Sequence, residues 1–178
     1  LLAAQCKGAV AFGEFFNFFD YFCVQDFGED YHLRADEIHS TRPKRTISAV
    51  IHQAYQQIVY GWNQPAGNRS YQSPFTNISY YDKNYWEAIF GEFTFPDGTK
   101  PSWERVDWLQ KDFMRWFNKE RTKALLTFPV ETMALLTDGG DDFMDKEYAD
   151  FTAQMWADGH SFFCYLSDSP DSLSSCCR

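Results

Sequence analysis

Two adjacent cysteines, Cys176 and Cys177, stand near the end of the sequence and are its most reactive feature. They follow the apolar run 161–166 and a Ser- and Asp-rich stretch, and Arg178 comes directly after them. Adjacent thiols can form a strained disulfide, share a soft metal or place two sulfur atoms beside one substrate, and a neighbouring arginine favours the thiolate. A buried thiol beside an incidental one fits the spacing equally well.

Polar side chains also gather on a run that alternates as a β-strand does and on the loop before it. The loop covers 63–70 and the strand covers 72–80. Their neutral donors and acceptors suit a ribose or phosphates, although ordinary strand and turn hydrogen bonds would use the same groups. The candidate substrate-binding residues are Asn68, Arg69, Gln72, Ser73, Thr76 and Asn77.

Other titratable residues give weaker signals. Glu131 lies at the end of an expected strand and could handle protons, but a carboxylate at a strand end more often faces water. We expect surface or capping roles, and no metal, for the four histidines, because their spacing matches no metal motif. These are His32, His39, His52 and His160. Five cysteines at irregular spacing contain no CxxC pair and fit a reducing cytoplasm.

The elements that must position these residues follow from hydrophobic periodicity. It predicts helices over 3–25, 46–62, 101–122 and 141–158. It predicts strands over 72–80, 124–132 and 161–166. Gly28 should stop the first helix, whose phenylalanines should pack in a core. The basic run 42–45 should be a solvated helix start with Pro43 in its first turn. The alternation predicts an α/β fold with parallel strands and no domain boundary across 1–178.

Composition excludes several classes of protein. With 44% hydrophobic and 19% aromatic residues, the chain can build a sizeable core and should not be disordered. A net charge of -9 argues against nucleic-acid binding, which needs clustered Lys and Arg. Lys7, Glu14 and Asp20 interrupt the apolar start, so we expect no membrane span. The chain begins with Leu1, and we expect the natural N-terminus to lie upstream.

Five motifs, taken in order, resemble the class III anaerobic ribonucleoside-triphosphate reductases. They are QCKGAVA at 5–11, the loop 63–71, QSPFTNIS at 72–79, LTFPV at 126–130 and SLSSCCR at 172–178. Each motif alone is weak, and the last is the most specific. Together they cover nearly the whole chain, which is therefore expected to be an internal piece of the catalytic subunit.

The resemblance implies part of a ten-stranded α/β barrel that ends in a finger loop with Cys177 at its tip. It implies the reduction of ribonucleoside triphosphates to deoxyribonucleoside triphosphates for DNA precursor synthesis. In the family, a glycyl radical outside this chain takes the thiol hydrogen, the thiyl radical removes the ribose 3′ hydrogen, and the 2′ hydroxyl leaves as water. Cys176 is expected to support or position its neighbour.

The resemblance alone also implies partners, effectors and a metal. The expected partners are the remaining segments of the reductase, a second catalytic subunit, a radical-SAM activating enzyme and ribonucleoside triphosphates. ATP and deoxynucleotide effectors are implied, and zinc is expected only in the missing C-terminal region. The piece alone should be inactive. A pyruvate formate-lyase relative fits the other motifs less well. The alternative from a different class is a non-catalytic α/β assembly module with structural or redox-sensing thiols.

Overall fold

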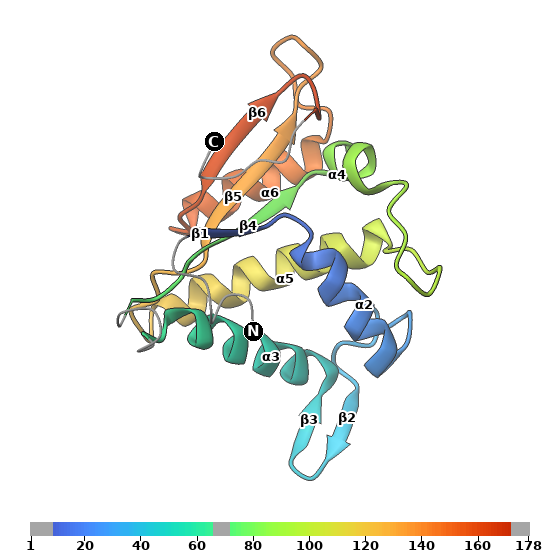
Figure 1. Ribbon diagram of the computed structural model, residues 1–178, viewed down its shortest axis with the longest axis vertical. Helices are drawn as coiled ribbons and strands as arrows, with labels where there is room; N and C mark the ends of the chain where they lie inside the picture. The colour runs from blue at the N-terminus through green and yellow to red at the C-terminus, as the bar shows by residue number, and fades with distance from the viewer. Residues whose placement is uncertain (1–8, 66–71, 172–178) are drawn as a thin grey trace.

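The computed structural model describes residues 9–65 and 72–171, which alternate between strands and helices (Figure 1). In chain order the elements are β1 (Ala9–Phe12), α2 (Phe15–Phe27), β2 (Ile38–Thr41), β3 (Lys44–Thr46), α3 (Ile47–Asn63), β4 (Phe75–Tyr81), α4 (Lys83–Phe90), α5 (Trp103–Arg121), β5 (Val130–Leu136), α6 (Lys146–Ala157) and β6 (Phe163–Ser167). None of the helices in the described part of the chain is both long and apolar enough to cross a membrane.

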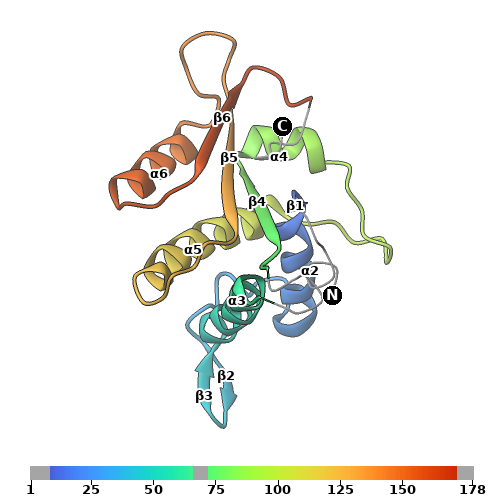
Figure 2. The ribbon, with the colours of Figure 1, turned by 60° about the vertical axis from the view of Figure 1, so that its left-hand side comes forward.

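A four-stranded sheet in the order β1-β4-β5-β6 forms the centre, and every neighbouring pair is parallel. The helices between these strands make the crossovers that parallel pairing requires. Figure 2 shows α5 and α6 on the same side of the strands. The predicted α/β fold with parallel strands is confirmed. The ten-stranded barrel and its finger loop remain predictions, because the described residues supply only these four strands to the sheet.

The two faces of the sheet have different neighbours. Successive side chains of β4 point to opposite faces. On one face, the ring of Tyr80 stacks on Phe16 of α2, with centroids 5.3 Å apart, and Phe16 in turn meets Phe113 of α5 at 5.7 Å. This face is covered by helices. The opposite face carries the small polar side chains of Asn77 and Ser79, which are also buried.

An ion pair inside the helical layer ties α2 to α5. The carboxylate of Asp20 is fully buried and accepts hydrogen bonds from Nε of Arg105 at 2.7 Å and from Nη2 at 3.1 Å. It also accepts one from the hydroxyl of Tyr31 at 3.0 Å. Both carboxylate oxygens of Asp20 are therefore hydrogen-bonded in the interior.

The first predicted helix is partly wrong. Residues 9–12 form β1, which pairs with β4, and the helix begins only at Phe15; residues 3–8 lie outside the described part. Gly28 ends the helix as predicted, with a φ of 90° that glycine adopts easily. Most of its phenylalanines pack on the core as predicted, but Phe22 is 63% exposed. The helix is therefore not engulfed.

Other local predictions also need correction. The basic run 42–45 is not a helix start: it spans the turn of a hairpin between β2 and β3. The strand predicted over 124–132 begins later, at Val130, since Pro129 has no N–H to give a sheet. Helix α4 was not predicted; Asp82 caps it by accepting a hydrogen bond from the backbone N–H of Tyr85 at 2.7 Å.

Candidate functional site

The predicted substrate strand is β4 and its lead-in, and the structure places three candidate residues there together. Thr76 and Asn77 are buried, and Ser73 is half-buried. The Ser73 hydroxyl donates to the carbonyl of Asn63 at 3.0 Å, and Nδ2 of Asn77 donates to the carbonyl of Val130 at 2.9 Å. Part of their hydrogen-bonding capacity therefore holds the sheet together.

Among the predicted site residues of this strand, two buried side-chain oxygens have no hydrogen bond to the described residues. They are Oγ1 of Thr76 and Oδ1 of Asn77. Since adjacent strand residues face opposite ways, only one of them can share the polar face of the sheet. That face holds Asn77, Ser79 and, on β5, Thr132, whose hydroxyl lies 3.0 Å from that of Ser79. This row of neutral groups is the candidate substrate-facing surface.

The other predicted site residues divide into two groups. Gln72 is described and exposed, at an isolated bridge before β4. The rest lie outside the described residues, so their predicted roles are untested. They are Asn68, Arg69, Cys176 and Cys177.

Asn63 at the end of α3 anchors the amino ends of both β4 and β5. Its Nδ2 donates to the carbonyls of Phe128 at 2.6 Å and Val59 at 2.8 Å. Its Oδ1 accepts from the backbone N–H groups of Thr127 at 2.8 Å and Phe128 at 3.0 Å. Because its backbone carbonyl also accepts from Ser73, Asn63 joins the end of α3 to the segments that lead into β4 and β5. The sequence carried no signal for this role, because a lone Asn beside a predicted loop is ordinary.

A buried carboxylate, Glu131, lies on the helix-covered face. It is 2% exposed, so the expectation that it faces water is wrong, since β5 continues past this position and turns the side chain inward. Its Oε1 accepts hydrogen bonds from the hydroxyl of Tyr80 and from Nε2 of His160, the latter at 2.9 Å. Burial and the Glu131 carboxylate raise the pKa of Tyr80 well above its usual range.

His160 is also buried, at 3% exposure, so the predicted surface or capping role is wrong for this histidine. Residue 160 lies three positions before the start of β6, and its ring contacts Glu131 in the core. Within 9–65 and 72–171, no group of three His, Cys, Asp or Glu side chains is placed to hold an ion.

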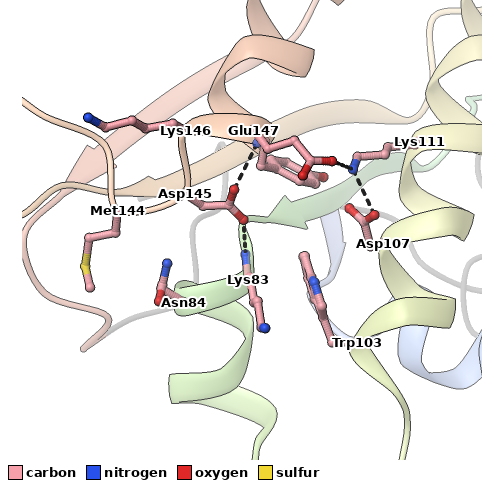
Figure 3. A pocket seen from close by; sticks show the side chains of 10 residues that line it. Lys83, Asn84, Trp103, Asp107, Lys111, Met144, Asp145, Lys146 and Glu147 are labelled. Carbon is pink, nitrogen blue, oxygen red and sulfur yellow. Dashed lines mark hydrogen bonds and ion pairs between the residues drawn. The ribbon is translucent and has the colours of Figure 1, made fainter.

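A cavity of about 400 Å³ lies at the carboxyl ends of β4 and β5, where α4 and α6 begin (Figure 3). Its charged groups are paired: Lys111 meets Asp107 at 2.8 Å and Glu147 at 3.6 Å, whereas Lys83 and Lys146 pair with carboxylates outside the cavity. Asp145 accepts from the backbone N–H of Lys83 at 3.2 Å, and it also caps α6. Burial raises the pKa of Asp107. The cavity contains none of the predicted site residues, and its paired charges select neither an anion nor a cation.

Comparisons with known proteins agree with the resemblance. The family model for the anaerobic ribonucleoside-triphosphate reductase matches residues 1–178. The anaerobic ribonucleotide reductase from Thermotoga maritima, solved in complex with dATP and CTP, is 34% identical with a TM-score of 0.77. That match covers 98% of this chain and 27% of the Thermotoga chain.

Another solved anaerobic ribonucleotide reductase is 35% identical with a TM-score of 0.76, over 97% of this chain and 25% of its own. The chain thus spans about a quarter of the length of these reductases. A search of curated proteins found no match. Because the family model spans every residue and the fold is shared with solved relatives, the chain belongs to the anaerobic ribonucleoside-triphosphate reductase family.

Proposed function

We propose that this chain is an internal segment of the catalytic subunit of an anaerobic ribonucleotide reductase, the piece that carries the substrate-attacking cysteine. The family match over 1–178 is the observation that carries the proposal. The parallel sheet with a buried polar row on one face supports it, because that row offers neutral groups to a nucleotide. The complete protein would reduce ribonucleoside triphosphates to their deoxy forms.

Cys177 is proposed as the residue that attacks the substrate. Its thiol would lose a hydrogen atom to the glycyl radical of another segment, and its sulfur would then remove the ribose 3′ hydrogen. Loss of the 2′ hydroxyl as water would follow, two electrons and two protons from a reductant outside this chain would complete the reduction, and the Cys177 thiol would return the hydrogen atom to the 3′ carbon. A water-poor surrounding would protect such an intermediate from side reactions. Cys176 would support its neighbour.

Substrate contacts are proposed for the amino end of β4 and the loop before it. Among the described residues there, Asn77 fits best, because it is buried on the polar face and its Oδ1 accepts no hydrogen bond in the described part of the chain. Thr76 and Ser73 would shape the same strand, with Gln72 at its exposed start. Asn68 and Arg69 would meet phosphates.

Partners and effectors are proposed from the family. The Thermotoga relative was solved with dATP and CTP, which supports nucleotide substrates and nucleotide effectors for the complete protein. We further propose a homodimer of catalytic subunits, a radical-SAM activating enzyme and a cytoplasmic location. Zinc would be held by a C-terminal region beyond these residues.

The test of the proposed function is Cys177→Ser in the complete protein. We expect turnover of ribonucleoside triphosphates to fall below detection, because an oxygen–hydrogen bond is too strong for reversible hydrogen exchange with a ribose carbon. Nucleotide affinity, measured by calorimetry, should stay within about threefold, since the two side chains are nearly isosteric.

Cys176→Ser is the matched control for that experiment. It changes the adjacent thiol in the same way, and we expect it to keep most of the turnover. Retained turnover in Cys177→Ser would overturn the site assignment. Equal loss in both variants would show that the choice between the two thiols is wrong.

A further inference from the structure

A second cavity, of about 190 Å³, adjoins the buried carboxylate of Glu131 at the amino ends of β5 and β6. One oxygen of this carboxylate is used: Oε1 accepts from Tyr80 and His160. The other, Oε2, is buried and accepts no hydrogen bond from the described residues. Buried carboxylate oxygens are normally hydrogen-bonded, so Oε2 lacks a donor that such an atom usually has.

Arg121 stands beside this oxygen but does not satisfy it. Its Nη1 lies 3.9 Å from Oε2, which is too long for a hydrogen bond. The guanidinium rests over the ring of Phe117, 5.4 Å from the centroid, and its side chain is 36% exposed. Glu131 and Arg121 both line the cavity, so a buried carboxylate with an unused acceptor stands next to a donor on a partly exposed cation.

The remaining walls are flat and apolar. Pro129 and Phe163 line the cavity, and Phe163 is 60% exposed. Phe162 lines it as well and is held in place by stacking on Trp156, with centroids 4.9 Å apart. Such walls suit an aromatic or other planar ring.

We propose that this cavity binds the amide edge of a small planar molecule. The amide N–H would donate to Oε2 of Glu131, the amide carbonyl would accept from Arg121, and the ring would lie against Pro129 and Phe163. A carboxylate in the same place would face Glu131 with no proton to donate. The ligand class is a ring bearing a carboxamide or a cyclic amide.

The site is separate from the proposed substrate surface. Ile78 pairs directly with Glu131 across β4 and β5, so the carboxylate points to the helix-covered face. Asn77 and Ser79 point to the opposite face. Binding in this cavity can therefore be measured whether or not the complete protein reduces nucleotides.

The test uses benzamide, benzoate and acetophenone with the complete protein, which differ only in the group that enters the cavity. Calorimetry should give benzamide a dissociation constant at least about tenfold lower than either analogue, because only benzamide supplies both a donor and an acceptor. In Glu131→Gln the preference for benzamide over benzoate should shrink to about threefold or less, since a neutral amide no longer repels a carboxylate.

Arg121→Leu tests the site independently if Glu131→Gln does not fold. It should weaken benzamide binding about tenfold, through loss of one charged hydrogen bond. Arg115→Leu is the matched control: its guanidinium also lies over a ring, that of Phe151 at 5.0 Å, but outside the cavity. Benzamide affinity should not change there.

Several results would overturn the proposal. Equal affinity for benzamide and acetophenone would show that the amide edge is not recognised. Equal effects of Arg121→Leu and Arg115→Leu would place binding elsewhere. A crystal structure of the complete protein soaked in benzamide is decisive too: the cavity holding only water, or a side chain from another segment, would end the idea.

Discussion

One polar residue, Asn63, fixes the segments that lead into β4 and β5. Asn63 uses both ends of its amide on the segment that leads into β5, and its carbonyl receives Ser73 from the segment that leads into β4. The candidate substrate row begins a few residues later on the same strands. The position of that row therefore depends on a side chain that contacts no part of it.

Replacing Asn63 by Ala should loosen the start of β5. The N–H groups of Thr127 and Phe128 would lose their acceptor, at a cost of about 1–3 kcal/mol. In the complete protein, hydrogen exchange of these two amides should accelerate by roughly 10- to 100-fold. Asn118→Ala, which removes one exposed bond to the Asp158 carbonyl, should leave these amides unchanged. Unchanged exchange in Asn63→Ala would refute the anchoring role.

At the scale of elements, strong periodicity predicted structure well and isolated short segments poorly. The helices predicted over 46–62 and 101–122 match α3 and α5 within two residues at each end. Their buried faces repeat every three or four residues over many turns, so the signal is long. Strand β1 and the hairpin β2–β3 have only three or four residues per strand, too few to show a period.

The candidate site, like the fold, could be predicted only in part. The alternation of the run 72–80 placed Thr76 and Asn77 on one strand correctly, whereas Ser73 lies just before that strand. The cluster of Glu131 and His160 could not be predicted, because the two residues are far apart in the chain and their burial depends on where β5 and β6 begin. Sequence spacing cannot predict the contact between Glu131 and His160 until the register of the strands is known.

The carboxylate of Glu120 joins α5 to α3, and its contribution to the stability of the fold should depend on pH. The Lys123 ammonium, 2.6 Å away, and the Tyr60 hydroxyl lower the pKa of Glu120. A lowered pKa means that folding favours the ionised form. The stabilisation is therefore present above the unfolded-state pKa and is lost as the pH falls through the folded-state pKa.

Glu120→Gln should accordingly destabilise the protein at pH 7 by less than about 1 kcal/mol, because Lys123 is largely exposed. The difference between variant and parent should shrink as the pH is lowered from 7 to 3. Melting temperatures of both proteins across this range would measure it. Glu92→Gln, which breaks a fully exposed pair with Lys100, should have no effect at either pH. A Glu120→Gln difference that grows in acid would contradict the assignment.

The molecule as a whole is an open sheet. Within the described residues, no strand pairs with the outer edge of β1 or of β6. On β6, the large apolar side chain of Leu166 is 58% exposed. Open edges and exposed apolar side chains are commonly covered by further chain. This agrees with a segment that spans about a quarter of the length of its solved relatives.

The 178-residue chain alone should therefore show no reductase turnover, whereas the complete protein should be active after activation under anaerobic conditions. Both can be assayed by the formation of deoxynucleotides from ribonucleoside triphosphates. Peptide mass spectrometry of the purified active protein should find segments on both sides of this chain. Turnover by the isolated chain would contradict the proposal that it is one part of the catalytic subunit.

The contact of Tyr80, Glu131 and His160 has a consequence for how these proteins diverge. Residues of β4, of β5 and of the segment before β6 meet at one buried carboxyl group. Losing Tyr80 or His160 leaves this group with one donor fewer in the core, and losing Glu131 leaves two donors without their acceptor. Single replacements are penalised more than a joint replacement by apolar residues. In an alignment of related sequences, the residues at these three positions, which lie 51 and 29 residues apart, should therefore change together.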